Sequence, residues 1–228
     1  MALLLRVLHD AFPGLLFQWQ QIIVFLSVAS MLLGSFAAIG QTSIKRLLAF
    51  SSIAHVGFIL IGLAAGTEYG VSSVLIYLAI YVVMTLGSFA AVLAMRRADE
   101  MDETIGSLAG LSQTNLPLAV AFAALLFSMA GIPPLAGFFA KFYVLDAAIK
   151  AGLTPLAVIG VLASVVGAFY YLRLVKIMFF DAPADNFIPA EPAVRWVVTL
   201  SALLVTLYVV YPAFLLDAAG TAARALVP

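Results

Sequence analysis

Residues 130–142 read AGIPPLAGFFAKF, an apolar run that contains two prolines, two glycines and a lysine. A proline inside a helix lacks the backbone N–H that the helix needs, and its ring clashes with the preceding turn. Pro133 and Pro134 are therefore expected to end a helix here and to leave carbonyl groups without partners. We predict a break that begins at Gly131 and ends at Gly137.

The length of the apolar run around this stretch also requires a break. As one straight helix, residues 117–149 would be about 50 Å long, whereas the hydrocarbon core of a bilayer is about 30 Å thick. Non-helical backbone is tolerated at membrane depth only where it is buried in protein or faces water. We therefore expect a discontinuous spanning helix whose break lies inside the protein.

Lys141 lies inside this span, where a charged side chain costs about 2.5–3.5 kcal/mol on insertion scales and usually faces a cavity or a partner. Broken helices beside an ionisable residue occur at ion sites in transporters. We therefore interpret Lys141 as an ion-binding or proton-carrying residue. The alternative is a lysine that reaches the outer interface beside Asp146 and Lys150.

The composition indicates a membrane protein. Of 228 residues, 65% are hydrophobic and 10% are charged, whereas soluble domains carry about 25% charged residues. The net charge of zero gives no reason to expect a nucleic-acid partner, and the lack of cysteine excludes disulfides and thiolate metal sites. The two histidines, His9 and His55, disfavour a multi-histidine metal or haem site. No metal or cofactor is therefore expected in this chain.

We predict an all-α fold: a polytopic transmembrane helix bundle forming a single membrane domain over residues 1–228. A spanning helix needs about 20 mainly apolar residues. About six such spans follow an N-terminal stub at residues 1–8, namely 20–40, 47–65, 71–95, the discontinuous 117–149, 153–179 and 193–217. Residues 1–12, MALLLRVLHDAF, have no signal-peptide pattern and resemble the end of a helix, so we expect a C-terminal portion of a longer protein.

The positive charges predict an orientation, because cytoplasmic loops carry an excess of lysine and arginine. Of the eleven lysines and arginines, seven fall on one side of the predicted spans, three fall on the other, and Lys141 falls on neither. The seven are Lys45, Arg46, Arg96, Arg97, Arg173, Lys176 and Arg195; the three are Arg6, Lys150 and Arg224. The first side is therefore predicted to be cytoplasmic and the C-terminus to lie outside.

His55 is close to the centre of the span 47–65, and Ser51 and Ser52 lie about one turn before it on the same predicted face. Imidazole titrates near physiological pH and can both donate and accept a proton. We favour a proton-relay or water-chain role for these residues over the alternative of a core histidine hydrogen-bonded to a neighbouring helix.

Seven further residues receive weaker interpretations. Lys45 stands at the cytoplasmic end of the same span and could line a proton entry route, whereas its neighbour Arg46 is explained as an interfacial anchor. Asp146 could be a counter-ion of Lys141 or an exit-side carboxylate, although a spacing of five is poor geometry for a direct pair on a helix. The group Tyr170, Tyr171, Arg173 and Lys176 is interpreted as an interfacial anchor.

Two segments resemble a known family. Residues 40–64, GQTSIKRLLAFSSIAHVGFILIGLA, and residues 127–145, FSMAGIPPLAGFFAKFYVL, are similar to segments of antiporter-like subunits. Those subunits occur in the proton-pumping NADH:quinone oxidoreductase, complex I, and in multisubunit cation/proton antiporters. Within this family the chain resembles subunit N, because the third span, residues 77–95, has no lysine or histidine and residues 170–180 read YYLRLVKIMFF.

The resemblance implies a role in proton translocation coupled to electron transfer from NADH to quinone, in the bacterial inner membrane. It implies that Lys141 is the charged residue of the broken helix near the outward-facing proton route, and that His55 lies on a hydrated axis through the membrane centre. NADH, FMN, iron–sulfur clusters and quinone are then expected on other subunits. The expected partners are the other membrane-arm subunits and the lipid bilayer; the alternative function is a subunit of a multisubunit Na⁺/H⁺ antiporter.

Overall fold

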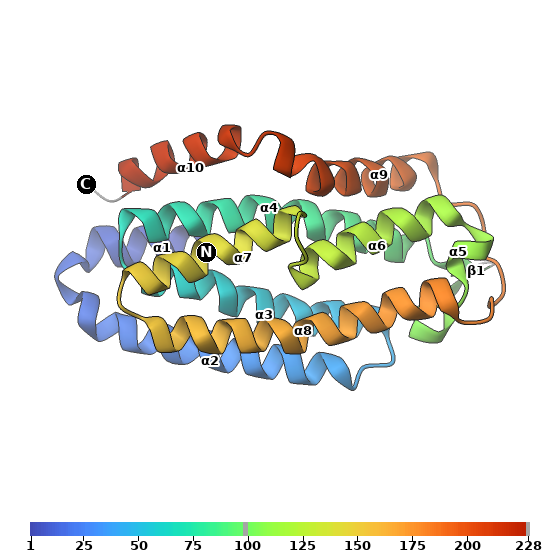
Figure 1. Cartoon of the computed structure of the whole chain (residues 1–228), viewed down its shortest axis with the longest axis horizontal. Helices are drawn as coiled ribbons and strands as arrows, with labels where there is room; N and C mark the ends of the chain where they lie inside the picture. The colour runs from blue at the N-terminus through green and yellow to red at the C-terminus, as the bar shows by residue number, and fades with distance from the viewer. Residues whose placement is uncertain (98–99, 227–228) are drawn as a thin grey trace.

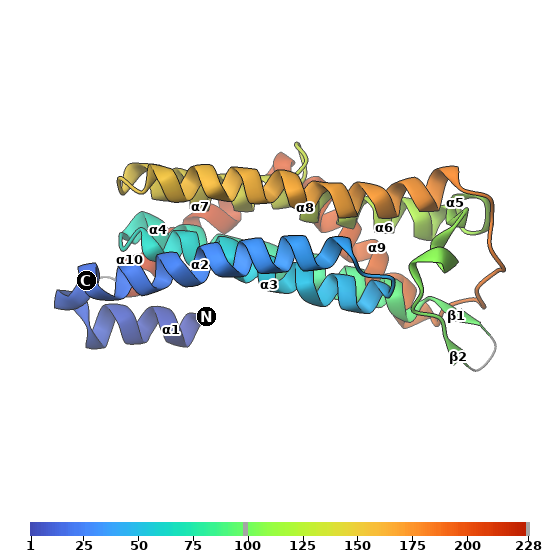
Figure 2. The same ribbon diagram turned by 90° about the horizontal axis from the view of Figure 1, so that it is seen from below.

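The structure is a computed structural model that describes residues 1–97 and 100–226. Its long helices lie roughly side by side along one axis, as Figures 1 and 2 show from two directions. Within these described residues, five helical segments are long and apolar enough to cross a membrane: α2 (Leu16–Ile39), α3 (Ile44–Ala64), α4 (Glu68–Leu93), α8 (Thr154–Phe180) and α9 with its 3-10 extension (Pro192–Val210). The prediction of an all-α polytopic bundle is confirmed.

The predicted break is also present. The fourth span consists of α6 (Leu116–Ala130) and α7 (Ala136–Lys150), with the loop between them visible near the middle of the bundle in Figure 1. Gly131 ends α6 in the left-handed conformation, with φ +86°, which favours glycine. A short loop follows, and α7 starts at Ala136.

The remaining elements are shorter than these helices. They are α1 (Ala2–Arg6), a π-helical turn (Val7–Ala11) and a 3-10 turn (Pro13–Leu15) before α2; β1 (Arg96–Arg97), β2 (Glu100–Met101), a 3-10 turn (Ile105–Leu108) and α5 (Leu111–Thr114) between α4 and α6; and a 3-10 turn (Tyr208–Val210) and α10 (Ala213–Leu226) after α9. The antiparallel β1–β2 ribbon, which pairs Arg96 with Met101, was not expected from the sequence.

The last predicted span, 193–217, is not one helix. It stops at the 3-10 turn Tyr208–Val210, and a second helix, α10, starts at Ala213. The interruption falls at Tyr211 and Pro212, where the proline removes a helical donor and disfavours the helical conformation of the residue before it. In Figure 1, α9 and α10 follow one another along the same side of the bundle.

Local sequence determines where several helices begin. The Ser43 side chain accepts a hydrogen bond from Arg46 N at the start of α3, and Thr67 accepts one from Gly70 N at the start of α4. The Asn115 side chain does the same for α6. Such caps satisfy N–H groups that have no partner within the helix.

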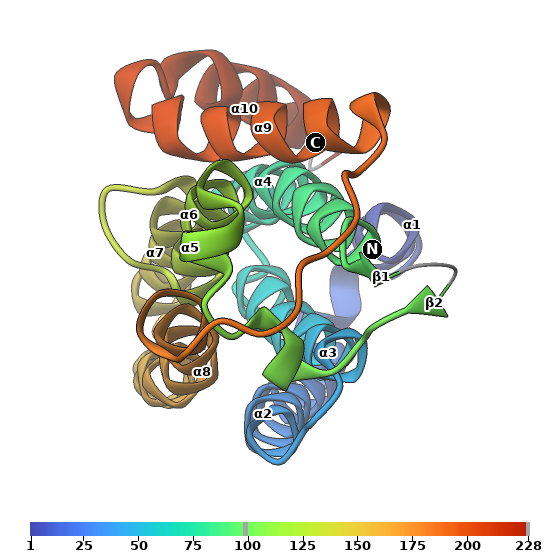
Figure 3. The ribbon, with the colours of Figure 1, turned by 90° about the vertical axis from the view of Figure 1, so that its right-hand side faces the viewer.

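Helix α3 occupies a central position, with α2, α4, α7 and α8 all in contact with it. The view along the bundle in Figure 3 shows α3 beside α2, with α8 and α4 on its other sides. In a membrane, helices associate through close packing of small residues. Gly34 of α2 and Gly57 of α3 serve this purpose, because a Cβ at Gly34 would lie 2.5 Å from Ala54 N and one at Gly57 would lie 2.7 Å from Met31 N.

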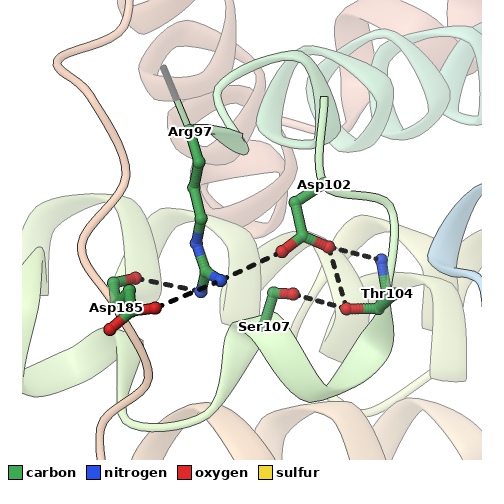
Figure 4. Close-up of polar contacts among 5 residues, drawn as sticks. All are labelled: Arg97, Asp102, Thr104, Ser107 and Asp185. Atoms are coloured by element: carbon green, nitrogen blue, oxygen red, sulfur yellow. Dashed lines mark hydrogen bonds and ion pairs between the residues drawn. The ribbon is translucent and has the colours of Figure 1, made fainter. Parts of the chain in front are cut away.

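One end of the bundle carries a polar cluster, which Figure 4 shows in close-up. Arg97 contacts the Asp102 carboxylate at 3.2 Å and donates to the Asp185 carbonyl at 3.0 Å, so it joins the loops after α4 and after α8. Thr104 donates to Asp102 from its backbone N (3.1 Å) and its hydroxyl (2.8 Å). Partial burial acts to raise the pKa of Asp102, but hydrogen bonds from Ser107 and Thr104 and the charge of Arg97 together lower it.

This end also gathers the larger group of positive charges. Lys45 forms an ion pair with Glu103, Lys176 forms one with Asp181, and Arg173 donates to the Ile39 carbonyl at 3.1 Å. At the opposite end, Lys150 is the last residue of α7, and α10 also ends there (Figure 1). The division of charges into two groups therefore corresponds to the two ends of the bundle.

Candidate functional site: a buried lysine at a helix break and a histidine between two tyrosines

Lys141 is buried, with 6% of its surface exposed. Its Nζ donates to the carbonyl oxygen of Ala130, the last residue of α6, at 2.9 Å, and to Ser164 Oγ of α8 at 2.9 Å. The ammonium also lies 4.9 Å from the centre of the Phe58 ring of α3. The side chain therefore points into the bundle at the break and does not reach the interface, so the alternative interpretation is wrong.

The break makes this position possible. The last carbonyls of a helix have no partner within it, and the C-terminal end carries a partial negative charge that favours a cation. Lys141 supplies one of its three N–H donors to such a carbonyl at Ala130. Gly131 leaves room for the lysine stem, because a Cβ there would lie 3.0 Å from Lys141 Cδ.

Gly137 holds the two half-helices together. Its backbone N donates to Ser128 Oγ at 3.0 Å, and a Cβ at this position would lie 1.8 Å from the Ser128 carbonyl oxygen. Only a residue without a side chain allows the first turn of α7 to approach the last turn of α6 so closely. Pro133 and Pro134 lie in the connecting loop, joined by a cis peptide bond.

His55 is the centre of a second buried group. Its Nδ1 lies 2.7 Å from the Tyr77 hydroxyl of α4, and its Nε2 lies 3.1 Å from the Tyr171 hydroxyl of α8. Tyr171 also bonds with Ser51 Oγ, which gives a continuous chain Ser51–Tyr171–His55–Tyr77 across three helices. A neutral imidazole has one donor and one acceptor nitrogen, so one tyrosine donates to the ring and the other accepts from it.

The structure separates the other predicted site residues from these two groups. Ser52 donates to the Leu48 carbonyl of its own helix at 2.9 Å. Lys45 is half-exposed and pairs with Glu103 at the end of the bundle. Asp146 accepts from Tyr69 and from Lys150, both at 2.7 Å, so its partners are at the bundle end and do not include Lys141.

The tyrosines are the functional candidates that sequence reasoning missed or misread. Tyr170 and Tyr171 are each 1% exposed, so their assignment to an interfacial anchor is wrong. Tyr77 is fully buried in α4, and nothing in its local sequence distinguishes it from the neighbouring Tyr81. The available indication was a hydroxyl within an apolar span, since a buried tyrosine O–H usually finds a partner.

One cavity lies away from both groups. Its volume is about 440 Å³, and it lies near the N-terminal ends of α6 and α9, where Asn115, Leu118, Phe187 and Arg195 contribute to its lining. Within residues 1–97 and 100–226, no group of three or more histidine, aspartate or glutamate side chains is arranged to hold a metal ion. The buried lysine and histidine are therefore the candidate site on the basis of their contacts.

Comparison with known proteins identifies the family. Residues 1–167 match the family described as "NADH:quinone oxidoreductase/Mrp antiporter, TM". The chain is 60% identical over 226 residues to NADH-quinone oxidoreductase subunit N of Methylobacterium nodulans, which covers 99% of this chain and 47% of that relative. It is 59% identical to the subunit of the same name from Parvibaculum lavamentivorans, over 100% of this chain and 47% of that relative. The chain thus spans about half the length of the curated relatives it matches.

Comparison with solved structures gives a result consistent with this family. A chain in respiratory complex I from Thermus thermophilus with bound aureothin has a TM-score of 0.77 and 32% identity, over 86% of this chain and 45% of that one. A chain in the Mrp complex from Dietzia sp. has a TM-score of 0.86 over 98% of this chain and 50% of that one; at 23% identity this likeness shows the fold alone. The chain therefore belongs to the NADH:quinone oxidoreductase/Mrp antiporter transmembrane family.

Proposed function

We propose that this chain takes part in proton translocation as the membrane-arm subunit N, or a part of it, of a respiratory NADH:quinone oxidoreductase in the bacterial plasma membrane. The names of its relatives support the assignment. The single observation that carries the proton-translocating role is Lys141, a buried ammonium that ends on the free carbonyl of a broken helix.

In this proposal Lys141 and His55 are proton stations. Lys141 holds a proton as an ammonium stabilised by the Ala130 carbonyl and the Ser164 hydroxyl, and releases it as a neutral amine. His55 accepts or donates a proton through either ring nitrogen, each of which has a tyrosine partner. Ser51 belongs to the histidine station through Tyr171.

The remaining candidates have peripheral roles. Lys45 could line a proton entry route at the end of the bundle that carries seven of the lysines and arginines, and Asp146 could be an exit-side carboxylate at the other end. We assign the first end to the cytoplasm and the C-terminal end of α10 to the outside, following the excess of positive charge.

Redox chemistry in this proposal belongs to other subunits. NADH, FMN, iron–sulfur clusters and quinone are held there, and this chain holds and moves protons within the bilayer. Its partners are the other membrane-arm subunits. The alternative is a subunit of a Na⁺/H⁺ antiporter, which the shared family includes. Purification of the intact assembly separates the two, because co-purified flavin and iron–sulfur subunits exclude a stand-alone antiporter.

The decisive test is Lys141→Ala in the intact complex. We expect NADH-driven proton pumping and coupled NADH oxidation to fall, because the only buried cation at the break described by the structure is removed. Lys176→Ala is the matched control, because that lysine is exposed and pairs with Asp181 at the bundle end. Wild-type pumping by the Lys141 variant in a normally assembled complex refutes the assignment.

A further inference from the structure

One aromatic ring touches both proposed stations. Phe58 lies three residues after His55 on α3, one helical turn away, and is 3% exposed. The centre of its ring is 4.9 Å from Lys141 Nζ and 6.5 Å from the centre of the His55 ring. Phe58 is therefore a shared neighbour of a station on α7 and a station on α3.

The polar atoms of the two stations have separate partners. Lys141 Nζ donates to Ala130 and Ser164, whereas the ring nitrogens of His55 are engaged with Tyr77 and Tyr171. Within the described parts of the chain, no hydrogen bond joins one set to the other. The Phe58 ring contacts both side chains, but it has neither a donor nor an acceptor and cannot relay a proton.

The ring also responds to the charge it contacts. A lysine ammonium within about 6 Å of an aromatic centroid is attracted by the ring face, and the attraction is larger in a desolvated site. This attraction exists only while the lysine carries its proton. The position of the Phe58 ring is thus coupled to the protonation state of Lys141.

We propose that Phe58 is the gate for proton exchange between Lys141 and His55, an inference that rests on the proposed function. The ring is held against the protonated lysine, and the arrangement described here is the closed gate. When the ring moves aside, water bridges the two side chains. One proton leaves the ammonium, which becomes a neutral amine, and one proton reaches the imidazole, which becomes imidazolium; the reverse transfer restores both, and no electron moves.

The test measures protons translocated per NADH oxidised in membrane vesicles that contain the intact complex. Phe58→Ala removes the ring, and we expect the ratio to fall while NADH oxidation remains at or above the wild-type rate, because protons leak between the stations. Phe122→Ala is the matched control: Phe122 is 1% exposed and stands eight residues before Ala130 on α6, about 12 Å along the helix axis, and its loss leaves a comparable void. We expect the control to keep the wild-type ratio.

Phe58→Leu keeps the proposal testable if the alanine variant assembles poorly, because leucine preserves an apolar side chain but has no ring face for the ammonium. We expect a lower ratio there as well. A wild-type ratio in an assembled Phe58 variant, or an equal fall in the Phe122 control, overturns the gate. If Lys141→Ala lowers pumping and the Phe58 variants do not, only the gate fails. If Lys141→Ala pumps normally, the proposed function fails.

Discussion

Gly137→Ala should separate the two halves of the broken helix. The new methyl group would lie 1.8 Å from the Ser128 carbonyl oxygen, 2.6 Å from its carbonyl carbon and 3.0 Å from its Oγ. An ordinary contact begins at 3.4 Å, so the start of α7 must move by the difference, 1.6 Å, relative to the end of α6. The two atoms nearest the methyl belong to the Ser128 backbone, which cannot rotate away as a flexible side chain would.

A displacement of that size reaches Lys141, which lies about one turn further along α7. Its 2.9 Å hydrogen bond to the Ala130 carbonyl would stretch beyond hydrogen-bonding distance if the movement is transmitted along the helix. Loss of a hydrogen bond to a charged group costs about 1.5–3 kcal/mol. Overpacking of a close-packed interior adds about 1–3 kcal/mol. The variant is therefore expected to lose several kcal/mol of stability or to hold Lys141 in an altered position.

The assay compares the amount of assembled complex on native gels with NADH-driven proton pumping in vesicles. We expect Gly137→Ala to reduce assembly, pumping or both. Gly40→Ala is the control, because a Cβ there has no atom within 4 Å and the residue has a φ of −80°, which any residue adopts. Wild-type assembly and pumping in the Gly137 variant would show that the close approach of the half-helices is not required.

Three shorter predictions follow. Tyr77→Phe leaves a buried imidazole nitrogen without its partner, at a cost of about 1–3 kcal/mol, and should lower the thermal inactivation midpoint of the complex. Tyr81→Phe is the control, because the centre of the Tyr81 ring lies 5.0 Å from the centre of the imidazole ring but Tyr81 is not part of the hydrogen-bonded chain. The pKa of Asp102 is lower in the folded loop than in the unfolded chain, where a carboxyl group has a pKa of about 4. The charged carboxylate therefore stabilises the loop fully at pH values above about 4, and this stabilisation is lost as the pH falls through the lower folded pKa. Asp102→Asn should therefore make the loop cleavable by protease at neutral pH and abolish the increase in cleavage on acidification; unchanged behaviour contradicts this. This chain has no cysteine, so a single new cysteine can be followed by the labelling of this chain alone. Lys176→Cys should react with a membrane-impermeant maleimide only from the cytoplasmic side and Lys150→Cys only from outside, since the two positions lie at opposite bundle ends; labelling from the reversed sides refutes the orientation.

Predictions from local features were accurate where the physical cause is local. The break between Gly131 and Gly137 follows from two adjacent prolines and from an apolar run longer than a bilayer is thick. The same physical cause acts at Pro212, which divides the last predicted span, 193–217, into α9 and α10 although the residues around it are apolar. The sequence predicts a buried position for Lys141. It does not identify the hydrogen-bond partner Ser164, because that residue belongs to a separate helix, α8.

The partners of His55 are even harder to predict from local sequence. His55 and Ser51 were selected from their spacing on one helix, and the structure brings both onto Tyr171. Tyr171 is 116 residues away from His55 in the sequence, and its neighbours Arg173 and Lys176 made it resemble an interfacial anchor. Which face of α8 turns inward depends on packing against α2, α3 and α6, which no local pattern specifies.

The amino-acid sequence by itself determined the class of protein, the approximate spans, the helix break and the presence of a charge inside it. These properties depend on hydrophobicity summed over about 20 residues and on the backbone chemistry of proline, both of which act along the chain. Only the tertiary structure decided that Lys141 ends on Ala130 and Ser164, that His55 lies between two tyrosines, and that Phe58 touches both. Those contacts join groups from α3, α4, α6, α7 and α8, and they arise because buried polar groups must find partners among whichever helices packing brings together.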